Sequence, residues 1–241
     1  AYLLNLRSFE LCNSTKPFAG LYIPKKNIKP VLITKNFKLN KISKISNNFN
    51  IFSEEKFIQY LRESKFKNIE TSYEFLNLNI YMRLSKFFNL SETRINISRY
   101  LGVKTSNEIK NIKSCHIEDG LAVIKFIIDL KQKNITPKNE YEISEFLYNK
   151  RKEGINFFRN SFDYISAFDS NAAIIHYKPL PNKSLSFKNR NILLIDSGAQ
   201  YLEGTTDITR VIKVGKKNFY KIKYFYTYLL KSLIKIENKI F

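Results

Sequence analysis

The strongest constraint on the fold of this chain is a pattern near residue 200 that carries two carboxylates. Two apolar runs, Asn191 to Ile195 and Ile208 to Val214, flank a segment rich in Gly and Thr, and Asp196 and Asp207 stand at the inner ends of these runs. If the runs pair as antiparallel strands about a turn at Tyr201-Leu202, Asp196 lies directly opposite Asp207. Their Cβ atoms are then about 4.5–5.5 Å apart on one face of the hairpin.

Two like charges so placed repel each other, so the arrangement favours a cation between them. A divalent metal ion, or two ions about 3.5–4 Å apart that share carboxylates, meets that need. Ordinary turn chemistry is an equally favoured interpretation of the spacing, because Asp and Thr bond their own backbone and Gly supplies positive φ. Since Tyr201-Leu202 is a poor two-residue turn, a wider or bulged loop that uses Gly198 and Gly204 is an alternative geometry.

The run from Asp196 to Arg210 closely resembles the metal-binding hairpin of the aminopeptidase P family of pita-bread metallopeptidases. Upstream, the segment from Asn171 to Pro179 resembles the part of that family that carries a substrate-side histidine, here His176. Two further segments, starting at Lys104 and Cys115, resemble the first helix of the family's catalytic domain, and residues 1–7 are similar to the opening of the domain before it.

The resemblance implies an α/β (α+β) chain with two domains. Residues 1–102 form a mixed-sheet, creatinase-like non-catalytic domain, and residues 103–241 form the first half of a pita-bread catalytic domain. The implied reaction is hydrolysis of the bond between an N-terminal residue and a following proline, with two divalent metal ions. Mn²⁺ is expected first, with Zn²⁺ or Co²⁺ as alternatives.

The resemblance also implies roles for individual residues. Asp196 would chelate one metal ion and Asp207 would bridge both. His176 would orient the substrate or stabilise the tetrahedral intermediate through a hydrogen bond. In this family a histidine and two glutamates complete the metal pair far downstream of the hairpin, and we expect them beyond Phe241, because His116 and His176 are the only histidines of the chain.

We therefore expect a partial chain that holds two metal ligands and is inactive alone. The remaining ligands would come from a separately encoded C-terminal half, and a homo-oligomer is a further possible assembly. One alternative is a catalytically dead remnant, or a binding and assembly partner, of the same fold. A basic nucleic-acid-binding module is a less favoured alternative.

The net charge of +20, from 41 basic and 21 acidic residues, is the reason to consider nucleic acid at all. The basic residues are scattered, however, and the high Lys, Asn and Ile content is typical of AT-rich codon usage. We predict a peptide substrate with proline at its second position, and neither a nucleic-acid nor a membrane partner. The chain lacks an uncharged apolar run of about 18 residues, and its two cysteines fall in different predicted domains, which indicates a reducing, cytoplasmic location.

Short apolar runs alternate with helical patterns over residues 1–101, which predicts a mixed α/β domain. Thr105 and Glu108 form a capping box that begins a helix from Ser106 to about Lys131. His116 is expected to be an ordinary helical residue there. The apolar positions that recur at helical spacing in this segment are Ile109, Ile112, Ile117, Leu121, Ile124 and Ile128.

A second helix is predicted to begin at Thr136-Pro137 and to end near Lys152. Two antiparallel strands, Ser161–Ala167 and Ala172–Tyr177, should follow, which places His176 on a strand. Beyond Gly215, an amphipathic pattern predicts a helix that faces the core; its apolar positions are Phe219, Ile222, Tyr226, Leu229, Leu230, Leu233 and Ile236.

Overall fold

A computed structural model describes residues 2–25, 28–35, 48–95, 97–215 and 220–239. Its helices and small sheets confirm the predicted α/β class. The chain divides into two compact units, Ala1–Lys110 and Asn111–Phe241. The division falls within one long helix, α5 (Ser106–Gln132).

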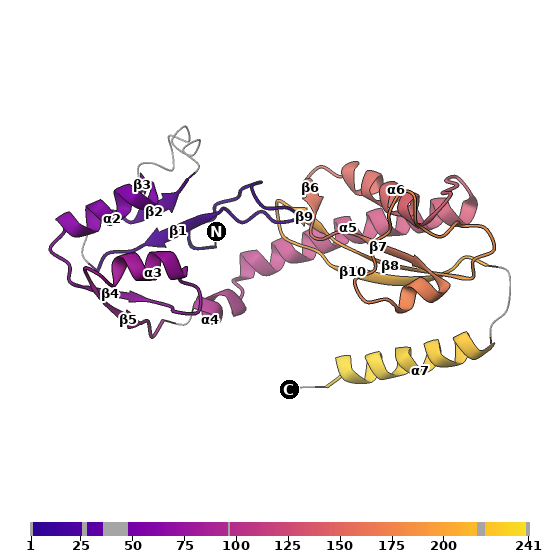
Figure 1. Cartoon of the computed structure of the whole chain (residues 1–241). Helices are drawn as coiled ribbons and strands as arrows, with labels where there is room; N and C mark the ends of the chain where they lie inside the picture. The colour runs from indigo at the N-terminus through magenta and orange to yellow at the C-terminus, as the bar shows by residue number, and fades with distance from the viewer. Residues whose placement is uncertain (1, 26–27, 36–47, 96, 216–219, 240–241) are drawn as a thin grey trace. The chain divides into compact units, whose positions relative to one another are not determined.

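The first unit contains two small sheets and three α-helices among its described residues (Figure 1). Strand β1 is antiparallel to β2, β3 is parallel to β2, and β4 and β5 form a separate parallel pair. Its elements are η1 (Tyr2–Leu4), β1 (Ala19–Tyr22), β2 (Val31–Thr34), β3 (Asn50–Phe52), α2 (Glu54–Glu63), β4 (Asn68–Thr71), α3 (Leu78–Leu84), β5 (Asn89–Glu92) and α4 (Ile97–Gly102).

The described residues of this first unit form a larger and a smaller apolar cluster, and the larger one is centred on β2 and α2. It joins Val31 of β2 to the buried side of α2, where Phe57, Ile58 and Leu61 recur at helical spacing, and it also includes Leu84 of α3. Ser53 caps α2, since its side chain accepts a hydrogen bond from the amide of Lys56. The unit thus has its own core.

The second unit carries the hairpin. Its central sheet has the order β10-β8-β7 with antiparallel neighbours, and β6 pairs with β9 beside it. The elements are α5, α6 (Glu140–Lys152), β6 (Phe157–Asn160), β7 (Ile165–Phe168), η3 (Asp169–Ala173), β8 (Ile192–Ser197), β9 (Ala199–Tyr201), β10 (Ile208–Lys213) and α7 (Tyr220–Glu237).

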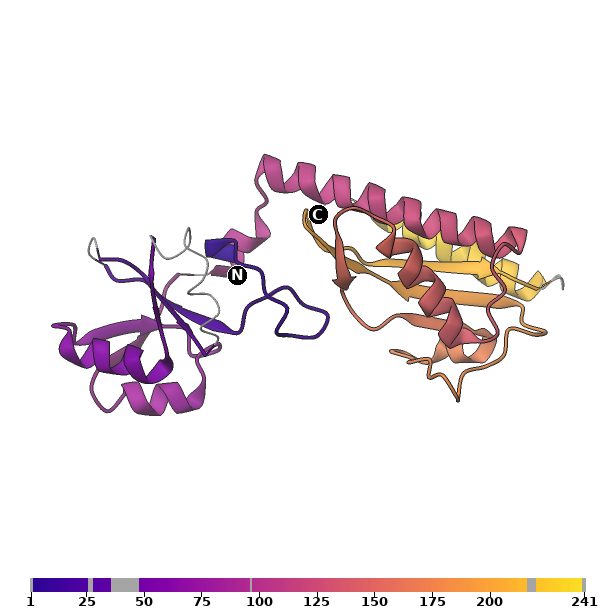
Figure 2. The same cartoon turned by 90° about the horizontal axis from the view of Figure 1, so that it is seen from above.

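Helices α5 and α6 pack on one face of the central sheet (Figure 2). The core cluster joins Phe126 of α5 and Leu147 of α6 to alternate residues of β8, Leu193 and Ile195. Because side chains alternate across a strand, Asp196 lies on the other face, away from the two helices.

The predicted start of α5 is confirmed. The amide of Thr105 donates to Glu108 Oε2 at 2.7 Å, and the amide of Glu108 donates back to Thr105 Oγ1 at 3.2 Å, which is the reciprocal pattern of a capping box. The predicted start of α6 is wrong. The helix begins at Glu140, because the side chain of Asn139 accepts from the amide of Glu142 and caps it there.

The buried face of α5 is not the stripe that the apolar spacing marks. Its buried residues are Cys115, Asp119, Ala122, Val123, Phe126 and Leu130. Five members of the predicted stripe are exposed: Ile109, Ile117, Leu121, Ile124 and Ile128. The spacing predicted a helix correctly and its packed side incorrectly.

Helix α7 forms over the described part of the amphipathic pattern, and the predicted position Phe219 lies outside the described residues. None of the described side chains of α7 is buried, so the expectation of a core-facing helix is not met. None of the helices in the described part of the chain is both long enough and apolar enough to cross a membrane.

A buried ion pair joins the two helices to the hairpin. Arg151 of α6 donates from Nε and Nη2 to the two carboxylate oxygens of Asp119 on α5, at 2.6 and 3.0 Å. Both side chains are fully buried. The hydroxyl of Tyr201, on β9, donates to Asp119 Oδ1 at 2.8 Å, and the ring of Tyr164 lies 5.0 Å from the Arg151 guanidinium carbon. Burial and the bond to Asp119 hold the pKa of Tyr201 above its usual value.

Removal of the Arg151 charge should show how much this ion pair contributes to the free energy of unfolding. Arg151→Met leaves the Asp119 carboxylate buried without its partner, so we expect the free energy of unfolding to fall by about 3–5 kcal/mol in urea titrations. Lys150→Met, one residue away, breaks only partly exposed ion pairs and should cost below about 1 kcal/mol. Equal losses in the two variants would contradict a structural role for the buried pair.

Candidate metal-binding hairpin

The hairpin forms, but its register differs from the prediction. Asp196 pairs with Thr209 and Ser197 pairs with Ile208, and the isolated bridge between Gln200 and Thr205 continues the same register toward the tip. The prediction that Asp196 lies directly opposite Asp207 is therefore wrong. The partner strand is displaced by two residues.

The displacement follows from the position of Tyr201 near the tip of the hairpin. Tyr201, which the prediction placed in the turn, lies in β9, where it pairs with Phe157 and binds Asp119. Its amide donates to the carbonyl of Gly204 at 2.8 Å, so the turn residues are Leu202 and Glu203, one position further along. When the turn moves by one residue along the chain, the pairing of the two strands shifts by two residues.

A shift of two residues keeps the two aspartates on the same face, since side chains alternate with a period of two. Asp207 directly precedes β10 and stands two residues before Thr209, the partner of Asp196. It is thus a diagonal neighbour of Asp196, at a typical separation of about 7–8 Å. This face is the one that α5 and α6 leave uncovered.

The two carboxyl groups interact. The pKa of Asp207 is raised above its ordinary value. Partial burial is the largest cause, followed by the charge of Asp196 and by a hydrogen bond between the two carboxyl groups. Thr209 Oγ1 donates to Asp196 Oδ1 at 2.9 Å and so orients that carboxylate. Carboxylate oxygens that repel each other suit a hard divalent cation such as Mn²⁺.

Gly198 lets the strands approach closely. None of the described glycines has a positive φ, so the turn interpretation based on that property is not supported. A Cβ on Gly198 would instead overlap the carbonyl oxygen of Thr206 and the hydroxyl of Ser161. That hydroxyl donates to the Thr206 carbonyl at 3.0 Å and so joins the segment that follows β6 to the segment that precedes β10.

His176 does not lie on a strand, so that prediction is wrong. After β7 the chain turns into η3, and His176 follows in a turn with a left-handed φ of 56° and an exposed side chain. Asp169, at the start of η3, is also left-handed, with φ 44°. Such values are uncommon outside Gly and persist only where the surroundings impose them.

The described residues bring together only part of the predicted site. Asp196 and Asp207 interact, whereas no hydrogen bond or ion pair within the described ranges joins His176 to either of them. His116 is an exposed residue of α5 whose Nδ1 lies 2.8 Å from the carbonyl of Ile112. Groups of three or more His, Cys, Asp or Glu side chains that could hold a metal ion do not occur in the described part of the chain.

Four contributors were missed by reasoning from the sequence: Thr209, Asp119, Arg151 and Glu140. Asp119 gave a readable signal, because it lies on the stripe Cys115, Ala122, Val123, Phe126 and Leu130, and a charged residue on a buried stripe needs a buried partner. Glu140 carries no comparable signal, because acidic residues are common in the first turn of a helix.

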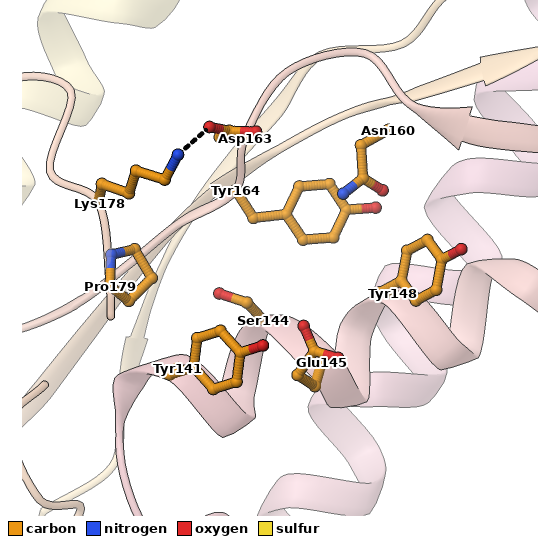
Figure 3. A pocket seen from close by; sticks show the side chains of 9 residues that line it. All are labelled: Tyr141, Ser144, Glu145, Tyr148, Asn160, Asp163, Tyr164, Lys178 and Pro179. Carbon is orange, nitrogen blue, oxygen red and sulfur yellow. Dashed lines mark hydrogen bonds and ion pairs between the residues drawn. The ribbon is translucent and has the colours of Figure 1, made fainter. Parts of the chain in front are cut away.

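A cavity of about 250 Å³ lies between α6 and the segments after β6 and η3 (Figure 3). Figure 3 shows three tyrosines along it, Tyr141, Tyr148 and Tyr164, with the ion pair of Lys178 and Asp163 at 2.6 Å on one side. Neither of the hairpin aspartates lines it. The candidate metal site and this cavity are therefore separate.

The sequence model of metallopeptidase family M24 matches residues 110–241, which is more than half of the chain. The chain belongs to this family. The M24 match covers most of α5, all of α6 and α7 and the whole hairpin, so the pair Asp196 and Asp207 lies within it.

Relatives agree with the assignment to family M24. The chain is 31% identical over 252 residues to Xaa-Pro aminopeptidase 1 of Dictyostelium discoideum, an alignment that covers all of this chain and 40% of the relative. It is 38% identical over 155 residues to a probable Xaa-Pro aminopeptidase P of Paracoccidioides brasiliensis, covering 63% of this chain and 25% of the relative. The chain thus spans two-fifths or less of these relatives.

Solved structures share the fold. An X-prolyl aminopeptidase from Caenorhabditis elegans, described as a cytosolic enzyme with a di-nuclear active site, matches with a TM-score of 0.73 and 22% identity, over 91% of this chain and 37% of that one. An Xaa-Pro dipeptidase from Bacillus anthracis matches with a TM-score of 0.67 and 22% identity, over 92% and 61%.

The raised pKa of Asp207 predicts how the M24 hairpin responds to pH without metal. The folded state holds this proton more tightly than the unfolded state, so stability falls as the pH rises from about 3.8 through the folded pKa. Asp207→Asn should therefore gain stability relative to the wild type as the pH rises, measured as the thermal unfolding midpoint between pH 3 and 7.

Asp129→Asn is the matched control, with the opposite sign. The hydrogen bond from Asn134 and the contact with Lys150 lower the pKa of Asp129, so its removal should cost stability at neutral pH and little at pH 3. A wild type that stays as stable as Asp207→Asn across the whole range would contradict the raised pKa of Asp207.

Proposed function

We propose that this chain is part of a metallopeptidase that releases an N-terminal residue from a peptide with proline at the second position. The observation that carries the proposal is the pair Asp196 and Asp207, held on the face of the sheet that α5 and α6 leave uncovered, in a register that brings the two carboxyl groups into interaction. The named activities of the relatives agree with it.

The residues present fit two ligands of a metal site. Asp196 and Asp207 would hold divalent ions, two in the complete enzyme, with Mn²⁺ the expected metal. Thr209 would orient the Asp196 carboxylate by the hydrogen bond described above, as outer-shell partners do in metal sites. Bound ions supply Lewis-acid polarisation of a scissile carbonyl.

His176 would face the substrate. Its exposed imidazole can donate a hydrogen bond to the substrate carbonyl or to the oxyanion that develops from it. Residues 1–102 would act as a non-catalytic domain and residues 103–241 as half of the catalytic domain. By analogy with the Caenorhabditis elegans neighbour, we propose a cytosolic location, where the unpaired thiols of Cys12 and Cys115 stay reduced.

The presence of only two proposed metal ligands, Asp196 and Asp207, also leads to an expectation about catalytic activity. A pair of carboxylates binds a divalent ion weakly, so this chain alone should turn over substrate poorly and should need the remaining ligands from a complementary segment. The same observation supports a second candidate, a non-catalytic binding or assembly partner of the same fold.

Isothermal calorimetry with Mn²⁺ tests the site. The chain should bind one equivalent weakly, and Asp196→Asn and Asp207→Asn should each weaken binding by at least about tenfold, since each removes half of the ligand set. Glu153→Gln, an exposed carboxylate of the second unit, is the control and should bind as the wild type does. Undetectable binding, or tight binding of two ions that survives both aspartate substitutions, would contradict the proposal.

Peptide selectivity separates the two candidates. With Mn²⁺ present, a peptidase site should bind Ala-Pro-Ala at least about tenfold more tightly than Ala-Ala-Ala, because a proline pocket adds apolar contact that alanine lacks. Equal or absent binding would favour the non-catalytic partner.

A further inference from the structure

Glu140 is a buried anion whose neighbours all donate to it. Its side chain is fully buried, at the first residue of α6. The carboxylate accepts from the amide of Phe168 at 2.7 Å, from the side chain of Asn171 at 3.1 and 3.2 Å, from the hydroxyl of Tyr177 at 2.7 Å and from the amide of Leu185 at 2.8 Å. No cation takes part in these bonds.

These donors come from one continuous stretch of chain. They are the end of β7, the middle of η3, the residue directly after His176, and Leu185 further on. The backbone of Glu140 adds two bonds to the same region, since its amide donates to the Leu185 carbonyl at 3.2 Å and its carbonyl accepts from Ser166 Oγ. A single side chain therefore ties both sides of the turn that presents His176.

The position of Glu140 explains how a lone carboxylate can be held there. It stands at the N-terminus of α6, where the helix dipole and free amides favour an anion. Hydrogen bonds to a charged acceptor are stronger than neutral ones. Burial first, and then the bond to Glu140, raise the pKa of Tyr177 to about 12, so its hydroxyl stays a donor at neutral pH.

We propose that Glu140 is a positioning residue for His176, which it holds through Tyr177. His176 and Asp169 both have left-handed backbones, and the stretch between them contains η3. Left-handed φ at a non-glycine residue relaxes unless its surroundings fix it. The bonds from Tyr177 and Asn171 to Glu140 supply that restraint on the two sides of the turn. The catalytic meaning of the restraint rests on the proposed role of His176.

Two variants separate positioning from general stability. Tyr177→Phe removes one hydroxyl and leaves the ring, and Glu140→Gln keeps the size but replaces an acceptor oxygen with a donor. Glu145→Gln, an exposed glutamate on the same helix, is the matched control. The full 241-residue chain contains two histidines, so imidazole NMR signals report on His176, with His116 as an internal reference.

In Tyr177→Phe and Glu140→Gln we expect the amides of residues 174–178 to exchange at least tenfold faster, and the His176 imidazole peak to move or broaden. The His116 peak and the exchange of core amides in β8 should stay at their wild-type values in Tyr177→Phe. If Glu140→Gln does not fold, Tyr177→Phe alone decides. An unchanged His176 peak and unchanged exchange at 174–178 in Tyr177→Phe would overturn the proposal, and so would a uniform increase over the whole chain.

A peptide titration keeps this test distinct from the proposed function. Ala-Pro-Ala, added with diamagnetic Zn²⁺, should shift the His176 peak of the wild type and shift it at least tenfold less at the same concentration in Tyr177→Phe. A wild-type His176 peak that ignores the peptide would refute the substrate-facing role, while the exchange rates would still decide whether Glu140 fixes the turn.

Discussion

The buried ion pair between Asp119 and Arg151 is the interaction on which the second unit depends. It joins α5 to α6, and the hydroxyl of Tyr201 extends it into the hairpin. Because Tyr201 is held in β9, the tip turns at the next two residues, and the register that follows places Asp196 opposite Thr209. The geometry of the candidate metal ligands is therefore set by a charge pair on the other side of the sheet.

A second buried carboxylate, Glu140, anchors the turn at His176 by hydrogen bonds, as Asp119 anchors the hairpin. Both carboxyl groups are fully buried, and both lie on helices that pack against the same face of the central sheet. Each accepts a hydrogen bond from a tyrosine outside the helices, Tyr201 for Asp119 and Tyr177 for Glu140. The helices thus fix the positions of residues that they do not themselves present to a ligand. Such support from packed helices is what a site needs when its two carboxylate ligands repel each other and bind a metal ion weakly.

Local sequence signals predicted the elements better than their packing. The capping box of α5 was found because its pattern is local, and the strands of the hairpin were found from their apolar runs. The register was missed because it depends on the long-range bond of Tyr201 to Asp119, which no local pattern contains. His176 was placed on a strand because its apolar neighbours resemble one, whereas Glu140 draws the chain into a turn. The family assignment followed from the residues around Asp196 and Asp207, since the M24 match includes both.

Paramagnetic broadening by Mn²⁺ tests most directly whether the hairpin register forms a metal site. Mn²⁺ added in small amounts should first erase the amide signals of Asp196, Asp207 and Thr209, and Asp207→Asn should abolish this selective loss. Signals of Leu193, which faces the helices, should persist longer. Broadening spread over scattered acidic residues, or centred away from the hairpin, would contradict the account.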